Sequence, residues 1–264
     1  MLELHFSDAE LDRRRDHITN FVREQVDTAG AEGAVLGLSG GIDSTLVAHL
    51  AVDALGAENV HGLVLPARVS GDDNMSDAER VARELEMSYD VIEIEPIVES
   101  LLGAYPEAEG DRMAVGNARA RVRGVLNYLV ANHESRLVLG TGNRSEGAVG
   151  YFTKYGDGAV DCHPIGNLYK VQVRQLARHV GVPDDLVEKP PTAELWADQT
   201  DEDELGLTYD TLDSILATHV DGPLSVDATA RHLGVEPETV EHVRALFEAS
   251  EHKRNPPPAP APIE

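Results

Sequence analysis

Cysteine and long apolar runs are nearly missing from this 264-residue sequence. A single cysteine, Cys162, excludes an internal disulfide framework and cannot supply a cysteine-based metal site. No stretch reaches the ~18 consecutive apolar residues of a membrane-spanning helix, so we expect no membrane partner. The opening residues, MLELHFSDAELDRRR, are too acidic and too poor in apolar length for a secretory signal. These absences favour a cytoplasmic protein.

Positive charge is also scarce. Lysine and arginine number 22 against 47 aspartates and glutamates, which gives a formal net charge of −25. Such a surface repels the phosphates of nucleic acids, so we expect no nucleic-acid partner. A dense acidic surface is typical of halophilic proteins, which it keeps soluble in concentrated salt. We therefore predict a salt-rich cytoplasm, with an ordinary acidic protein as the alternative.

The first half of the sequence contains a regular alternation of apolar runs and helical spacing. We predict strands at residues 33–40, 60–66, 89–94 and 136–142, and helices at 7–29, 43–55, 77–85, 97–103 and 114–133. Nearly all-apolar strands that alternate with helices indicate a parallel sheet covered on both faces. The predicted fold is therefore α/β, a Rossmann-like, doubly wound parallel sheet whose strand-to-helix turns gather at one ligand-binding edge.

The second half of the chain begins with a long polar stretch. Residues 143–168 are rich in glycine and too long for a simple connector, so we predict a functional loop. Helices resume from residue 170, and residues 255–264 form a proline-rich tail that cannot pack as a helix. We expect a single domain over residues 1–264, with its core at about 7–254 and a helical C-terminal segment.

Residues 225–247 have the helix, glycine turn and helix rhythm of a DNA-binding helix-turn-helix. Acidic residues, among them Asp227 and Glu238, outnumber Arg231 and Arg244 there, so a phosphate backbone would be repelled. We interpret this segment as two packed surface helices that lead the chain back to the ligand site.

The turn after the first predicted strand reads Ser39-Gly40-Gly41-Ile42-Asp43-Ser44. Two glycines let backbone N–H groups face an anion, and the N-terminus of a helix adds partial positive charge. No GK[ST] follows, so this is not a Walker motif. Asp43 is a candidate Mg²⁺ ligand, because an aspartate beside bound phosphates needs a cation between them. The alternatives are a serine-capped tight turn and an aspartate that interacts with the helix dipole.

This turn resembles the SGGxDS pyrophosphate loop of the ATP pyrophosphatases, which split ATP between its α and β phosphates. Six further segments look like the ordered motifs of the NAD synthetase family: GNARARVRG (116–124), GTGNRSEGAVGYFTKYGDGAVD (140–161), GNLYK (166–170), EKPPTAELW (188–196), DEDELGLTYDTLD (201–213) and HKRNPPP (252–258). The resemblance runs from about residue 33 to 260. It implies an adenine nucleotide alpha hydrolase-like fold and an ammonia-dependent enzyme that uses ATP to amidate deamido-NAD, the last step of NAD biosynthesis.

The resemblance also implies roles for individual residues. The ATP site would comprise Gly37, Leu38, Ser39, Gly40, Gly41, Ile42, Asp43, Ser44, Thr141, Lys170 and Thr192. Asp43 and Glu146 would bind Mg²⁺, with ATP as co-substrate. Deamido-NAD would be bound by Arg121, Lys154, Asp161, His252 and Lys253. The predicted catalytic residues are Asp43, Lys170 and Asp161, and the family implies a homodimer.

A plain structural role is the alternative for several of these residues. Glu146 would then be a solvated loop acid, Arg121 a member of surface ion pairs and His252 an ordinary surface histidine. The pyrophosphate loop begins at residue 39, which leaves no room ahead of it for a glutaminase domain, so we expect free ammonia or a separate partner as the nitrogen source. The competing functions are a synthetase acting on a purine nucleotide and a catalytically silent nucleotide sensor.

Overall fold

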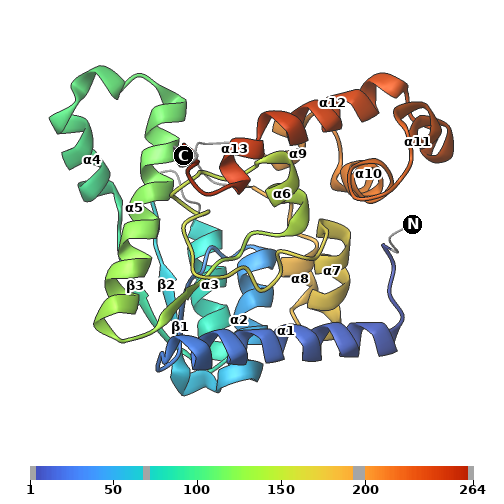
Figure 1. Ribbon diagram of the computed structural model, residues 1–264. Coiled ribbons are helices and arrows are strands. Elements are labelled where there is room, and N and C mark those ends of the chain that lie inside the picture. Colours follow the sequence, from blue (N-terminus) through green and yellow to red (C-terminus); the bar gives the residue numbers. More distant parts are fainter. Residues whose placement is uncertain (1–3, 68–71, 193–199, 261–264) are drawn as a thin grey trace.

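The computed structural model describes residues 4–67, 72–192 and 200–260 (Figure 1). Its helices are α1 (Asp8–Ala29), α2 (Ile42–Leu55), α3 (Asp72–Glu84), α4 (Glu95–Ala104), α5 (Arg112–His133), α6 (Arg144–Val149), α7 (Lys170–His179), α8 (Asp184–Val187), α9 (Asp201–Leu205), α10 (Tyr209–Ile215), α11 (Val226–Leu233), α12 (Pro237–Ala249) and α13 (Glu251–Arg254). Shorter helical turns are η1 (Ala57–Asn59), η2 (Pro106–Ala108) and the π-helical η3 (Leu216–Val220). The strands are β1 (Ala34–Gly37), β2 (Val60–Val64), β3 (Ser88–Val91) and β4 (Leu137–Leu139). Part of the EKPPTAELW motif, residues 193–196, lies outside the described residues.

The four strands form one parallel sheet in the order β3-β2-β1-β4. Ala34 of β1 pairs with Val60 of β2 on one side and with Leu137 of β4 on the other. The strand order therefore switches direction at β1, and the carboxyl ends of β1 and β4 flank the crevice where such sheets bind ligands. The predicted doubly wound α/β fold is confirmed.

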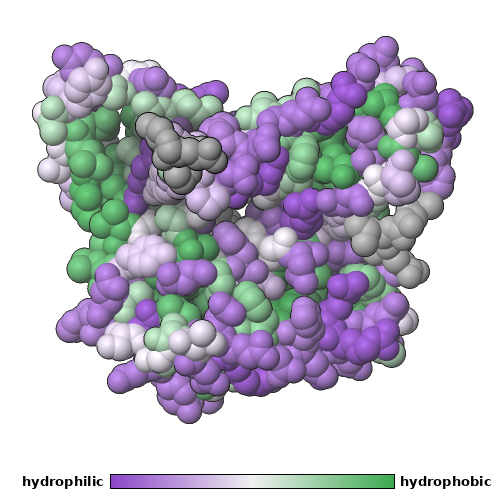
Figure 2. All heavy atoms as spheres, viewed as in Figure 1, coloured by the Kyte–Doolittle hydropathy of each residue, from purple (hydrophilic) through white to green (hydrophobic). Residues whose placement is uncertain are grey.

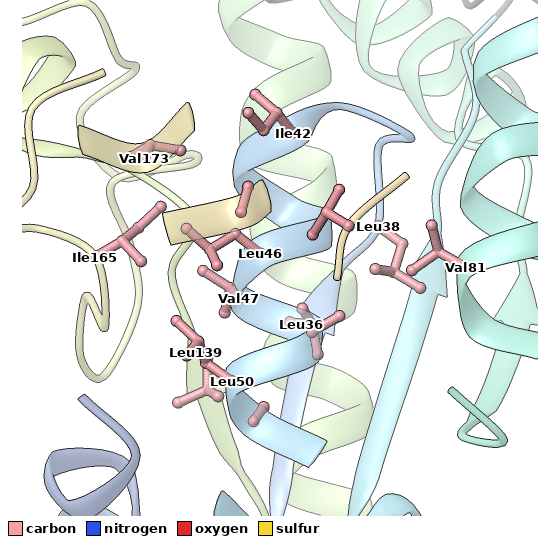
Figure 3. Close-up of a cluster of buried hydrophobic side chains, with 14 of the residues drawn as sticks. Leu36, Leu38, Ile42, Leu46, Val47, Leu50, Val81, Leu139, Ile165 and Val173 are labelled. Atoms are coloured by element: carbon pink, nitrogen blue, oxygen red, sulfur yellow. The ribbon is translucent and has the colours of Figure 1, made fainter. Parts of the chain in front are cut away.

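Alternate residues of the buried strands point to opposite faces of the sheet, and each face has its own helices. Leu36 and Leu139 pack against Leu46 and Leu50 of α2 (Figure 3), in a cluster that α1 and α7 complete. Val35 belongs to a separate cluster on the other face, which includes residues of α4 and α5. Because both faces are covered, the carboxyl edge of the sheet is left for ligands.

A third apolar cluster organises a helical lobe, which we define as α6 together with residues 200–254 (Figure 1). Tyr209 of α10 and Val240 of α12 are fully buried in it. Helices α11 and α12 are the pair predicted at 225–247, and they are joined at Gly234, whose φ of 70° is left-handed. The lobe returns the chain to the edge of the sheet, as the sequence predicted.

Several boundaries near this edge differ from the prediction, and β1, β2 and β3 end at Gly37, Val64 and Val91 rather than at residues 40, 66 and 94. Residues 143–168 contain helix α6 rather than loop alone, because Asn143 and Glu146 form a capping box that starts a helix there. Strand β4 ends at Leu139 rather than at residue 142, and beyond it Gly140 N donates to Cys162 O (2.8 Å), beside an isolated parallel bridge between Leu139 and Cys162. Neither of the 22-residue helices, α1 and α5, nor any other helix in the described ranges is apolar over enough length to cross a membrane.

Candidate functional site

Residues 38–41 connect β1 to α2 in a tight loop at the carboxyl edge of the sheet. Gly40 has a φ of 74°, a left-handed conformation that favours glycine. Ser39 N donates to Ser44 Oγ (3.2 Å) and Gly41 N donates to Ser39 Oγ (3.3 Å), which closes the loop on itself. Gly41 is the N-cap of α2, and no described side chain caps it. The first N–H groups of α2, with the positive end of its dipole, remain available to an anion.

Asn143 joins the two carboxylates predicted to bind metal. Its Nδ2 donates to Asp43 Oδ1 (2.8 Å), its Oδ1 accepts from Glu146 N (3.0 Å), and its own N donates to Glu146 Oε2 (3.3 Å). Asp43 follows β1 and Glu146 follows β4, so the switch in strand order brings them together. Asn143 was not among the predicted site residues, although an asparagine followed three residues later by glutamate is the signal of a capping box.

Lys170, the first residue of α7, reaches between these carboxylates. Its Nζ pairs with Asp43 Oδ2 and lies 3.4 Å from Glu146 Oε1. The lysine side chain is 3% exposed, and both carboxylates are 17% exposed. The structure therefore brings Asp43, Glu146 and Lys170 into one site that is largely shielded from water.

Burial shifts the acid–base equilibria of this site. Burial, and then the charge of Asp43, raise the pKa of Glu146 above its ordinary value. Burial by itself would lower the pKa of Lys170, but the carboxylates of Asp43 and Glu146 outweigh it and raise that pKa. Lys170 is therefore held as a cation, and Glu146 needs positive charge beside it to stay ionised.

Two residues that the sequence analysis did not assign to the site enclose Lys170. The ring centroid of buried Tyr209 lies 5.1 Å from Lys170 Nζ, within the range of a cation–π contact. Tyr209 OH donates to Asp201 Oδ2 (2.9 Å), and burial raises the pKa of Asp201. Both residues fall in the DEDELGLTYDTLD motif, so the motif itself was the available signal.

A pocket of about 790 Å³ opens around these residues, a volume in the usual range for cofactor and substrate sites. Its walls come from the ends of β1, β2 and β4, from α5 and from residues 150–158, and Figure 2 shows the surface hollowed between α4–α5 and the helical lobe. The predicted ATP residues in its lining are Gly37, Leu38, Ser39, Gly41, Ile42, Asp43, Ser44, Thr141, Lys170 and Thr192. Gly40 lies in the same loop.

Four of the five residues predicted for deamido-NAD form a rim cluster, Arg121, Lys154, His252 and Lys253. Lys154 Nζ donates to His252 O, and Arg121 Nη2 donates to Lys154 O (3.4 Å). Lys253 Nζ donates to two carbonyls of residues 150–158 (2.7 and 3.0 Å), and Lys253 also lines the pocket. Lys253 is the member of this cluster that lines the pocket, and Arg121, Lys154 and His252 lie outside its lining.

Asp161 lies apart from the rim cluster. Its Oδ1 accepts from Tyr128 OH (3.0 Å) and its Oδ2 accepts from Val138 N (2.8 Å). These bonds tie it to the outer side of β4, outside the lining of the pocket. The structure does not bring Asp161 to the other predicted residues, and its role in substrate binding and catalysis stays a prediction.

The arginines of α5 divide between different partners. Arg119 pairs with Glu95 (3.0 Å), and Arg121 belongs to the rim cluster. Arg123 lines the pocket, and its Nε donates to Leu65 O (3.0 Å). Helical spacing turns these three side chains to different sides. Arg123 therefore lines the pocket, whereas Arg121, the arginine predicted for deamido-NAD, does not, and the alternation in GNARARVRG could not distinguish them.

A glycine-rich loop and helix N-terminus at the switch point of a parallel sheet, with paired carboxylates and a buried lysine in one pocket, define a nucleotide-binding α/β enzyme. Residues 15–257 match the family model of NAD synthase. The chain belongs to the NAD synthase family.

Relatives and solved structures agree with this assignment. A curated NH(3)-dependent NAD(+) synthetase from Halobacterium salinarum is 65% identical over 98% of this chain and 97% of its own length. The structure of NMN synthetase from Francisella tularensis superposes with a TM-score of 0.83 at 35% identity, covering 97% of this chain and 99% of that one. An NH3-dependent NAD synthetase from Campylobacter jejuni, solved with a nitrate ion, gives a TM-score of 0.80 at 29% identity over 95% and 99% of the two chains.

Proposed function

We propose that this chain is a ligase that uses ATP and ammonia to convert the nicotinic acid carboxylate of deamido-NAD into the amide of NAD. One observation carries the proposal: the pyrophosphate-type loop meets Asp43, Glu146 and Lys170 at the carboxyl edge of the sheet. The Halobacterium and Campylobacter relatives, both NH3-dependent NAD synthetases, support both the product and ammonia as the nitrogen source.

Asp43 and Glu146 fit a magnesium ion. Hard carboxylate oxygens suit Mg²⁺, which takes one or two of them and completes its shell with phosphate oxygens and water. The pair already surrounds a cation, the Lys170 ammonium. Among the described residues, no group of three His, Cys, Asp or Glu side chains forms a fuller metal cage. When bound, Mg²⁺ would neutralise phosphate charge.

The proposed reaction has two steps. A carboxylate oxygen of deamido-NAD attacks the α-phosphorus of ATP, the bond to the oxygen that bridges to the β-phosphorus breaks, and pyrophosphate leaves an acyl-adenylate behind. The nitrogen of ammonia then attacks the acyl carbon, loses a proton to water, and AMP departs from the NAD amide. ATP is needed because a carboxylate does not react usefully with ammonia at neutral pH.

The residues of this chain would hold the two anionic reactants together and offset their charge. The loop before α2 and the first N–H groups of that helix suit the ATP phosphates. Thr141, Thr192 and Lys170 line the same pocket. The rim cluster, with its three cationic side chains, suits deamido-NAD. Holding reactants in place supplies much of the rate of such reactions.

We also propose that the chain forms a homodimer through the outer face of α4 and α5. Val125 and Leu129 of α5 are 68% and 63% exposed, and Leu101 of α4 is 50% exposed. Figure 2 shows apolar side chains gathered over α5 on this side. An apolar face on so acidic a chain is typical of a contact surface. Light scattering should give twice the chain mass of 28.5 kDa, and Val125→Glu should shift it to one chain mass.

The net charge of −25 supports a cytoplasm with concentrated salt and a protein without nucleic-acid partners. Repulsion among exposed carboxylates is screened over ~10 Å at 0.1 M salt and ~3 Å at 1 M. The melting temperature should therefore rise between about 0.1 and 3 M KCl. A flat or falling melting temperature would contradict adaptation to salt and leave the proposed reaction untouched.

One assay tests the reaction. The protein with ATP, Mg²⁺, deamido-NAD and ammonium should release NAD, AMP and pyrophosphate in equal amounts. Glutamine should not replace ammonium. A parallel reaction should contain nicotinic acid mononucleotide in place of deamido-NAD, since the Francisella neighbour is an NMN synthetase. We expect the mononucleotide to be a poorer substrate than deamido-NAD. Failure to form NAD and AMP from deamido-NAD would refute the proposal.

A further inference from the structure

Lys170 lies where a metal ion would have to lie. Its Nζ contacts Asp43 Oδ2 and lies 3.4 Å from Glu146 Oε1, and these are the two carboxylates that the proposed function assigns to Mg²⁺. An ammonium and a divalent cation repel each other strongly in a buried site and cannot both lie between the same two oxygens. If the metal enters, the ammonium must leave that position.

The backbone of Lys170 cannot follow such a movement. Lys170 N donates to Ser145 Oγ (2.9 Å), and Val171 N donates to Asp213 Oδ2 (2.9 Å). Ser145 Oγ donates in turn to Asp213 Oδ1, and all these groups are buried. Only rotations within the lysine side chain can move the ammonium, so its new partner must lie within reach of the same Cα.

Asp201 offers such a partner. Its Oδ2 accepts from Tyr209 OH, while its Oδ1 is buried and accepts no hydrogen bond from the described residues. The nearby Tyr151 hydroxyl donates to Glu204 (2.8 Å) and also acts on the Asp201 carboxyl, where it opposes the effect of burial on the pKa. An unpaired buried carboxylate oxygen is costly, and Asp201 is 4% exposed in the lining of the same pocket.

Tyr209 connects the two positions. Its ring lies 5.1 Å from Lys170 Nζ, and its hydroxyl holds Asp201. An aromatic face stabilises an ammonium that has left its carboxylates. The negative charge of Asp201 already acts on Lys170, since it is among the charges that raise the lysine pKa.

We propose that Asp201 is a positioning residue that receives the Lys170 ammonium when a metal ion binds between Asp43 and Glu146. The inference rests on the proposed metal site. In the metal-free protein Lys170 holds the two carboxylates together. In the metal-loaded protein it rests on Asp201 and Tyr209, beside the nucleotide pocket. The carboxylate pair is thus never without a cation.

Mn²⁺ binding without nucleotide, followed by the electron paramagnetic resonance of the free ion, tests this exchange. Lys170→Met removes the competing ammonium and should tighten Mn²⁺ binding about fivefold or more, the low end of coupling between linked ligands. Asp201→Asn removes the resting place and should weaken binding in the wild-type background. In the Lys170→Met background it should have no effect, because Asp201 acts through Lys170. Asp201→Glu should restore part of the affinity.

The controls separate the exchange from the metal site on which it rests. If Asp43→Asn binds Mn²⁺ as tightly as wild type, the metal site itself is wrong. If Asp43→Asn loses binding while Lys170→Met leaves it unchanged, only the exchange is refuted. Glu204→Gln removes an exposed carboxylate from the same pocket and should weaken binding less than Asp201→Asn. Equal weakening by Asp201→Asn in both backgrounds, or none in either, would overturn the positioning role, and melting curves check that each variant folds.

Discussion

The charged side chains of the pocket have different partners in two regions, the buried metal side (Asp43, Glu146 and Lys170) and the rim cluster. Asp43, Glu146 and Lys170 compensate one another directly and are almost hidden from water. Lys154 and Lys253 donate instead to backbone carbonyls, which carry no full negative charge. Two carboxylates face one ammonium, so Lys170 offsets part of the negative charge on the metal side, whereas the rim keeps positive charge for an anionic substrate. Removing a charged group from the metal side should therefore slow the reaction, whereas removing one from the rim cluster should weaken substrate binding.

The largest effect should follow from Asp43→Asn. The substitution keeps the size of the side chain and removes a charge that offsets both Lys170 and the proposed metal. We expect kcat/KM for NAD formation to fall roughly a thousandfold, because metal-assisted charge neutralisation supplies several kcal/mol. Steady-state kinetics at saturating Mg²⁺ measure it.

Asp53→Asn is the matched control, since Asp53 lies on the same helix and its exposed side chain is 4.0 Å from Arg15. It should leave kcat/KM within about twofold of wild type, as surface pairs contribute little. A folded Asp43→Asn protein with the same turnover as Asp53→Asn would remove Asp43 from the metal site.

A smaller effect, on the KM of one substrate, should follow from Lys253→Met. The variant loses two hydrogen bonds to residues 150–158 and one rim cation. We expect KM for deamido-NAD to rise about tenfold, since a charged hydrogen bond contributes ~1.5–3 kcal/mol, while KM for ATP changes little. Arg244→Met, which removes an exposed cation of α12 paired with Glu248, is the control. Equal increases in both KM values would show that the two sides of the pocket do not work separately.

The same contrast explains what could be predicted from the sequence. Asp43 and Glu146 follow apolar strands, and strand ends of a parallel sheet meet at one edge, so their proximity was predictable. The capping box of Asn143 and the motif that contains Asp201 mark both residues locally, but their contacts with Asp43 and Tyr209 depend on side-chain geometry that local patterns do not give. Helix α6 was not predicted because it is short and lies among glycines, although the sequence contains its capping box. The positions of β1, β2 and β4 were predictable because burial leaves nearly uninterrupted apolar runs, whereas β3 (Ser88–Val91) is mostly exposed and more polar.

The smallest expected effect concerns Tyr128 and Asp161, outside both sides of the pocket. Burial, and then the charge of Asp161, raise the pKa of Tyr128 to about 12 from an ordinary value of 10.0. The unfolded chain therefore gives up this proton first as pH rises. The resulting stability is fully present below pH about 10 and is lost as pH rises towards about 12.

Tyr128→Phe removes this titration, so its free energy of unfolding should fall less than that of wild type between pH 9 and 11.5. Solvent screening of a partly exposed group limits the difference to about 1 kcal/mol. Urea unfolding followed by circular dichroism at several pH values measures it. In Asp161→Asn the tyrosine loses the neighbouring charge, its pKa should move back towards 10, and the alkaline loss should begin earlier. Identical pH profiles for wild type, Tyr128→Phe and Asp161→Asn would show that the hydrogen bond between Tyr128 and Asp161 (3.0 Å) does not persist in solution, which would free the Asp161 carboxylate to bind an incoming ligand.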